Sequence, residues 1–204
     1  IPILLPDLNR SFARFTVEEG AIRYGLLGVK NVGEKAIEAI VQAREESGPF
    51  VSIVDLCERV DARAVNRKVL ESFIKCGALD SFGIERNQLL GSIEDITKYA
   101  QAARKVADTS QSGLFGAGFA STAKPKSLLF AAATPATEQE KLLWEKELLG
   151  LYVSEHPLTY AKEKMSAMKP TLIKDILAER SGVKSYRVAG MVASVKSIVT
   201  KTGK

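Results

Sequence analysis

The stretch that decides the fold is Leu26-Leu27-Gly28-Val29-Lys30-Asn31-Val32-Gly33-Glu34-Lys35-Ala36. Its two glycines bracket a tight turn, and Asn31 stands where a left-handed backbone conformation is tolerable. Val32 is expected to tuck between the two flanking helices, and Ala36 is small enough for the second helix to approach the first closely. The pattern predicts a helix-hairpin-helix unit.

The chemistry of this turn favours an anion. The helix after Gly33 exposes free backbone N–H groups at its N-terminus, with Lys30 and Lys35 beside them. These amides and the positive end of the helix dipole suit a phosphate oxygen, and such a contact positions a DNA duplex without reading its bases. An ordinary corner between two helices is the alternative. The candidate DNA-binding residues of this turn are Gly28, Lys30, Asn31, Val32, Gly33 and Lys35.

A weaker copy of the pattern follows downstream. The helix expected over residues 66–75 runs into Cys76-Gly77-Ala78-Leu79-Asp80 and then into a helix that begins near Arg86. Two such units, related by a pseudo-two-fold axis, would present their hairpins to the two strands across a minor groove. Lys75 and Gly77 are the candidate phosphate contacts of the second copy. Because its glycine pattern is weaker, structural support is the alternative role.

Periodicity and composition divide the rest of the chain. Residues 1–24 predict a short hairpin or an extended stretch, 25–106 a helical domain, and 107–137, rich in Ser, Thr, Gly, Ala and Pro, a flexible linker. Residues 138–182 predict a helical connector and 183–204 a strand. A lone strand leaves its backbone groups unpaired, so we expect its sheet partners beyond the last residue and the chain to be part of a longer protein. The expected helices span about 34–46, 52–60, 66–75, 86–106, 138–149, 157–169 and 171–180.

The overall composition limits the classes of function. The 29 basic and 24 acidic residues give a net charge of +5, which permits a polyanionic partner without demanding one. No apolar run approaches the about 20 residues that cross a bilayer, and no signal peptide is recognisable. Cys57, Cys76 and the single histidine, His156, are too few for a disulfide framework or a zinc site. The cysteines are expected to be buried small hydrophobic residues in a reducing cytosol.

The chain contains, in this order, the runs Leu5-Pro6-Asp7-Leu8-Asn9-Arg10-Ser11, residues 24–36, Gly48-Pro49-Phe50, residues 55–60, residues 66–71, residues 74–80, residues 150–158 and Arg187-Val188-Ala189-Gly190-Met191-Val192. In this order the runs resemble the α subunits of bacterial replicative DNA polymerase III. The resemblance implies that residues 1–24 end a fingers domain, that 25–106 form a tandem helix-hairpin-helix domain, and that 183–204 begin an OB domain. The fold class expected is therefore mainly α, with flanking short β segments and an incomplete OB-type β start.

The resemblance also implies partners for the linker. The run Gln111-Ser112-Gly113-Leu114-Phe115 resembles the peptide by which this family binds its sliding clamp. Leu114 and Phe115 would enter an apolar pocket while Gln111 fixes the register. Further partners implied are double-stranded DNA, the remainder of the polymerase chain and the holoenzyme subunits, in the cytoplasm and without a membrane.

Polymerase activity is expected of the parent protein and not of this chain alone. That chemistry needs closely placed carboxylates that hold two Mg²⁺ ions. The acidic residues here form no such cluster, and the family's catalytic aspartates belong to its palm, upstream of Ile1. We therefore expect no catalytic residue, metal site or cofactor in this chain, with Mg²⁺ expected for the parent polymerase. His156, before Pro157, is expected to shape a helix entry.

Two rival functions stay open at this stage. A DNA-repair or recombination protein could hold helix-hairpin-helix pairs beside an OB fold. A helical scaffold that binds no DNA would use the hairpin glycines only as turn residues.

Overall fold

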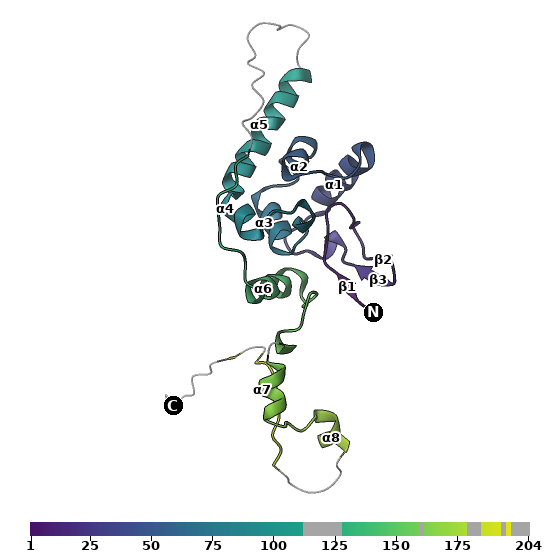
Figure 1. Ribbon diagram of the computed structural model, residues 1–204. Coiled ribbons are helices and arrows are strands. Elements are labelled where there is room, and N and C mark those ends of the chain that lie inside the picture. The colour runs from purple at the N-terminus through teal and green to yellow at the C-terminus, as the bar shows by residue number, and fades with distance from the viewer. Residues whose placement is uncertain (112–127, 160, 179–184, 193–194, 197–204) are drawn as a thin grey trace, which may run out of the picture. The chain divides into compact units, whose positions relative to one another are not determined.

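The computed structural model describes residues 1–111, 128–159, 161–178, 185–192, 195 and 196. The chain forms two compact units, Ile1–Ser154 and Glu155–Lys204 (Figure 1). The fold is mainly α, as expected, with a small three-stranded sheet.

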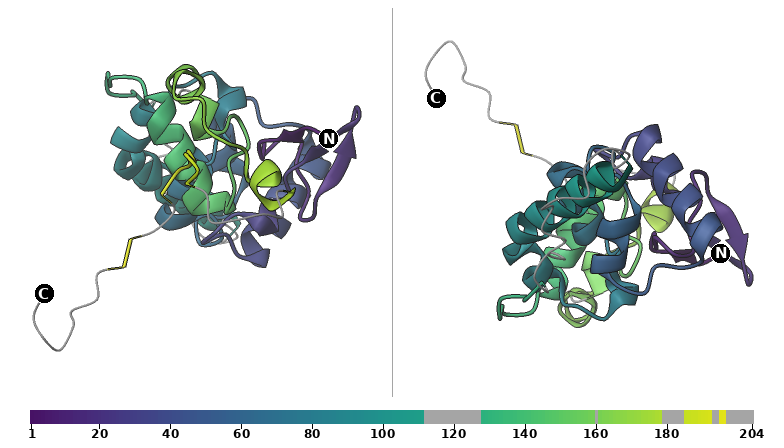
Figure 2. Two further views of the ribbon diagram at one scale, coloured as in Figure 1. Left: turned by 90° about the horizontal axis from the view of Figure 1, so that it is seen from below. Right: turned by 90° about the horizontal axis from the view of Figure 1, so that it is seen from above.

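The sheet of the first unit lies at the N-terminus. Its strands are β1 (Ile3–Leu4), β2 (Thr16–Glu18) and β3 (Ala21–Arg23), in the order β1-β3-β2. β2 and β3 pair antiparallel and form the predicted hairpin, while β1 pairs parallel with β3. Glu19 and Gly20 both have positive φ, 49° and 81°, which suits a tight two-residue hairpin turn. In both views of Figure 2 the sheet lies at one side of the unit and α5 at the other.

The helices of the first unit largely follow the predicted spans. Ser52 and Asn66 cap the second and third helices, because their side-chain oxygens accept backbone N–H groups. The helix expected over 86–106 is instead broken at Ser92 into two. The helices are η1 (Leu26–Gly28), α1 (Glu34–Ser47), α2 (Ile53–Arg59), α3 (Arg67–Lys75), η2 (Asp80–Phe82), α4 (Arg86–Gly91), α5 (Ile93–Gln111) and α6 (Glu138–Leu149).

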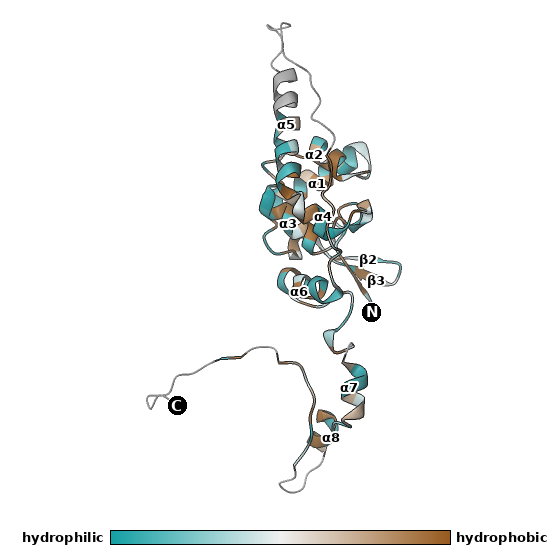
Figure 3. Ribbon diagram, turned by 60° about the vertical axis from the view of Figure 1, so that its left-hand side comes forward, coloured by the Kyte–Doolittle hydropathy of each residue, from teal (hydrophilic) through white to brown (hydrophobic). Residues whose placement is uncertain are grey.

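The core of the first unit is centred on α3. Phe73 and Ile74 of this helix are fully buried, and α3 contacts α4, α5 and α6. Apolar parts of α1, α3 and α4 lie next to one another in Figure 3. The buried guanidinium of Arg44 joins the N-terminal segment to α1, since it donates to the carbonyl oxygens of Leu8 (2.8 Å) and Ser11 (2.9 Å). One continuous core therefore holds the N-terminal segment, the hairpin and α6.

The second unit is built from short elements. It contains η3 (Pro157–Thr159), α7 (Lys162–Ala167) and α8 (Ile173–Ala178). The expected connector over 138–182 is thus divided, because α6 belongs to the first unit. The described residues 185–192, 195 and 196 form no strand, so an OB domain that begins here stays a prediction. Within the described residues no helix is long and apolar enough to cross a membrane.

Candidate nucleic-acid interface

The first hairpin has the backbone geometry that its sequence predicts. Asn31 adopts the left-handed conformation, with φ 69°. Its side-chain amide donates to the hydroxyl oxygen of Ser72 on α3 at 3.2 Å. Val29 is buried and Val32 packs half-buried against the core, so the apolar side of the turn faces inward. The polar backbone of residues 30–33 is left at the surface.

The N-terminus of α1 is open. Gly33 is its N-cap residue and has no side chain that could bond the first amides. Among the described residues, the N–H groups of Gly33, Glu34 and Lys35 donate no hydrogen bond. A Cβ built at Gly33 would meet nothing within 4 Å. The start of this 14-residue helix therefore presents three amides to open space, the arrangement that binds a phosphate.

Two lysines lie beside these amides. The side chains of Lys30 and Lys35 are exposed, and within the described part of the chain neither forms an ion pair. The carboxylate of Glu34 follows the cap residue, so the two ammonium groups outnumber one negative charge. The backbone N–H of Lys30 is already bonded to the carbonyl oxygen of Leu148 at 2.9 Å. Lys30 therefore has only its side chain to offer a ligand.

Gly28 has a packing role. A Cβ at this position would lie 2.6 Å from the ring of Tyr24, so any larger residue would displace the ring. The hydroxyl of Tyr24 in turn donates to the carbonyl oxygen of Leu149 at the end of α6, at 2.8 Å. Burial raises the pKa of Tyr24, so this donor keeps its proton. The support that α6 gives the hairpin is a feature that the sequence did not indicate.

The second hairpin differs from the first at Gly77, one of its two predicted phosphate contacts. Gly77 follows α3 with φ 84°, and its N–H donates to the carbonyl oxygen of Ile74 at 3.2 Å. The N–H of Ala78 donates to Phe73 at 2.9 Å, which completes the pair of bonds typical of a glycine-terminated helix. Gly77 is buried and its amide is occupied. It ends a helix and does not face a ligand.

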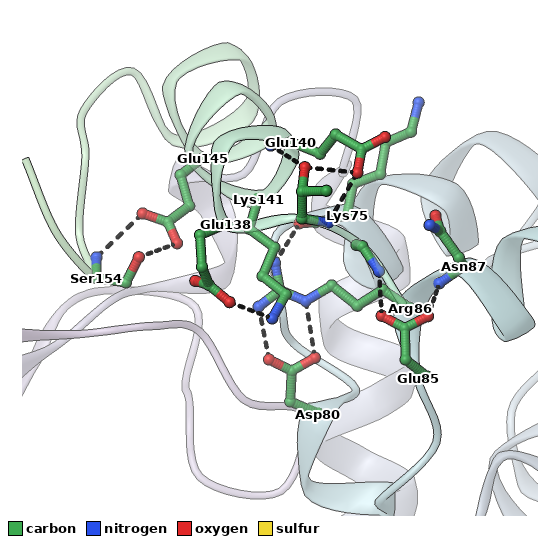
Figure 4. A network of polar contacts seen from close by, with 12 residues as sticks. Lys75, Asp80, Glu85, Arg86, Asn87, Glu138, Glu140, Lys141, Glu145 and Ser154 are labelled. Carbon is green, nitrogen blue, oxygen red and sulfur yellow. Dashed lines mark hydrogen bonds and ion pairs between the residues drawn. The ribbon is translucent and has the colours of Figure 1, made fainter. Parts of the chain in front are cut away.

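Side chains around Gly77 complete this closure (Figure 4). Arg86 is 5% exposed and binds the Asp80 carboxylate through Nε (2.9 Å) and Nη2 (2.6 Å). Its guanidinium occupies the space that a Cβ at Gly77 would need. Lys75, the other predicted contact, pairs with Glu71 at 2.6 Å. These contacts favour structural support, the alternative role of the second copy, and its DNA contacts stay a prediction.

The helix start of the second copy is also occupied. Glu85 is the N-cap of α4, and its carboxylate accepts the N–H of Asn87 at 2.6 Å. The other carboxylate oxygen accepts the N–H of Ala136 at 2.8 Å. The Asn87 side chain donates to the carbonyl oxygen of Thr134 at 2.9 Å. At the start of α4, the Glu85 carboxylate therefore occupies a first-turn amide and bonds the chain segment that returns at Ala136. At the start of α1, the corresponding amides after Gly33 have no such partner among the described residues. Of the two hairpins, both within the described residues, the first is the one whose following helix starts with unbonded amides.

Gln111 is the last residue of α5, whereas Leu114 and Phe115 lie outside the described residues. Within the described part of the chain no group of three His, Cys, Asp or Glu side chains could hold a metal ion. Cys57 and Cys76 are free thiols, and burial raises the pKa of each to about 12. Buried Glu145 accepts the N–H groups of Val153 and Ser154 and shapes the turn after α6.

Comparison with known proteins agrees with this architecture. The family described as "Helix-hairpin-helix motif" matches residues 1–89. The DNA polymerase III subunit alpha of Thermus aquaticus is 38% identical over 205 aligned residues, which cover 100% of this chain and 16% of that protein. The same subunit of Escherichia coli K12 is 37% identical and that of Bacillus subtilis is 37% identical, again over 100% of this chain and 18% and 17% of those proteins. The chain spans less than a fifth of these relatives, and over its whole length it belongs to the family of the DNA polymerase III α subunits.

Proposed function

We propose that the first unit binds duplex DNA through the Gly28–Gly33 hairpin, with contacts to the phosphate backbone and none to the bases. The observation that supports this most directly is the open N-terminus of α1, where three amides and two exposed lysines surround the vacant side of Gly33. Backbone N–H groups at a helix start bind phosphate irrespective of the base attached to it. In the parent polymerase this grip would hold the duplex behind the active site.

The test is a titration of a fluorescent duplex of arbitrary sequence at several salt concentrations. The variant Gly33→Asp with Lys30→Glu places a carboxylate on the amides and reverses one lysine. We expect steep loss of binding with salt for the unaltered chain, and no binding for the variant. A matched control, Lys98→Glu with Gln101→Glu on the exposed face of α5, alters the net charge equally. If the unaltered chain binds no DNA at low salt, the proposal is wrong, and a helical scaffold that binds no DNA becomes the favoured function.

We also propose that residues 111–115 bind the sliding clamp of the replicative polymerase. Gln111, Leu114 and Phe115 are the contact residues, as the resemblance implies. Gln111 belongs to α5, and residues 112–115 lie outside the described residues. Catalysis of nucleotidyl transfer, with its Mg²⁺ ions, belongs in this proposal to other parts of the parent protein. Primer extension by this chain alone would contradict that assignment.

A further inference from the structure

The solvent-facing side of α3 carries a cation that no part of the proposed grip uses. Most of this helix is buried, and its outer side presents Lys68, Glu71 and Lys75, with Arg67 at its start. Lys75 is neutralised by Glu71 at 2.6 Å, and Arg67 lies 3.2 Å from Glu94. Among the described residues no carboxylate lies within ion-pair distance of Lys68, and its side chain is exposed.

Lys68 stands next to the first hairpin in space. Asn31 of the hairpin donates to the hydroxyl of Ser72, which is one helical turn after Lys68 on the same side of α3. Side chains four positions apart on a helix have Cβ atoms about 5–6 Å apart. Successive phosphates of one DNA strand advance by about 3.4 Å along the duplex axis. The Cβ of Lys68 therefore lies about 5–6 Å from that of Ser72, the residue that the hairpin touches, so its ammonium can reach a phosphate within a few nucleotides of this contact.

We propose that Lys68 binds a DNA phosphate close to the phosphate held at the start of α1. The inference rests on the proposed function of the hairpin and adds a second helix to it. The N-terminus of α3 itself offers no site, because the Asn66 side chain occupies the amides of Lys68 and Val69. The contact therefore comes from the side chain of Lys68 alone, and it depends on charge and not on a particular base.

The experiment measures the dissociation constant of a labelled mixed-sequence duplex against salt for the unaltered chain, Lys68→Gln, Lys68→Arg and Lys98→Gln. One lost phosphate contact lowers the salt slope by about 0.9, so the affinity ratio between Lys68→Gln and the unaltered chain shrinks by about 3.5-fold from 50 to 200 mM salt. Lys68→Arg should restore the slope because it keeps the charge. Lys98→Gln removes another exposed lysine, 3.7 Å from Asp95 on α5, and should leave the slope unchanged.

Each outcome bears on a separate claim. If the unaltered chain binds with a steep slope and Lys68→Gln matches it, the hairpin grip stands and the role of Lys68 is wrong. An equal loss of slope in Lys98→Gln would assign the effect to net charge and would also overturn it. If the unaltered chain shows no salt-dependent binding, the proposed function itself, duplex binding by the Gly28–Gly33 hairpin, is wrong. Thermal unfolding of Lys68→Gln at the unaltered temperature shows that the fold is intact.

Discussion

The hydroxyl of Tyr24 donates a hydrogen bond of 2.8 Å to the carbonyl oxygen of Leu149, 125 residues further along the chain. The same oxygen lies 3.2 Å from the carbonyl oxygen of Gly28. One buried group therefore joins the start of the hairpin to the end of α6. The backbone N–H of Lys30 strengthens this junction through its own bond to Leu148. The orientation of the hairpin depends on a helix that follows the linker.

Removing this hydroxyl should loosen the junction. Tyr24→Phe leaves the buried carbonyl group of Leu149 without its donor, so we expect the free energy of unfolding to fall by about 1–2 kcal/mol. Urea unfolding of the two proteins measures this difference, with an unchanged slope against urea. The comparison variant Phe15→Leu alters the ring that packs edge-on against Tyr24 and keeps the hydrogen bond. An unchanged free energy in Tyr24→Phe would show that this hydroxyl does not stabilise the junction between the hairpin and α6.

Gly33→Ser should affect stability and DNA binding in opposite directions. Gly33 has an ordinary φ of −94° and open space at its Cβ, so serine fits without strain. Its hydroxyl oxygen would accept one of the free amides of α1 and stabilise the helix by a few tenths of a kcal/mol. The same bond removes a donor from the phosphate site. We expect an equal or higher unfolding temperature with several-fold weaker duplex binding, whereas a scaffold would gain stability only.

Local sequence signals predicted the first hairpin, the helices over 34–75 and their caps, because each depends on residues within a few positions. The break between α4 and α5 could not be predicted in this way. The hydroxyl of Ser92 accepts the N–H of Ala131, 39 residues away. Glu85 closes the second hairpin through Ala136, 51 residues away. The asymmetry between the two hairpins therefore comes from tertiary contacts that a short motif does not contain.

That asymmetry predicts different effects of two lysine substitutions. Lys30→Gln removes a cation beside open amides, and we expect duplex binding to weaken and its salt slope to fall by about 0.9. Lys75→Gln, made together with Glu71→Gln, removes both partners of an ion pair without a change in net charge. This second variant should bind like the unaltered chain in the same titration. Weaker duplex binding by the variant Lys75→Gln with Glu71→Gln would show that the second hairpin also contacts DNA.

The buried thiols make stability sensitive to alkaline pH. Burial raises the pKa of Cys76 to about 12, above the value near 8.5 of an unfolded thiol. The folded protein then keeps a proton that the unfolded chain releases, so stability falls as pH rises above 8.5, by about 1.4 kcal/mol per pH unit for this thiol. Urea unfolding at pH 8, 9 and 10 should show a shallower decline for Cys76→Ala. Parallel pH profiles would contradict the prediction.

Clamp binding should depend on Leu114 and Phe115, at the end of the peptide 111–115, and not on exposed apolar residues that follow residue 127. Leu114→Ala with Phe115→Ala removes the two side chains that would fill an apolar pocket, and such anchors carry most of the affinity of a short peptide. We expect the variant to lose capture by immobilised sliding clamp while it keeps its duplex affinity, because the hairpin lies elsewhere in the chain. Leu129→Ala is the control, since Leu129 is 83% exposed and lies outside the peptide. Capture of the double variant at the unaltered level would show that residues 111–115 are not the clamp site, and loss of capture in the control would point to the segment after residue 127 instead.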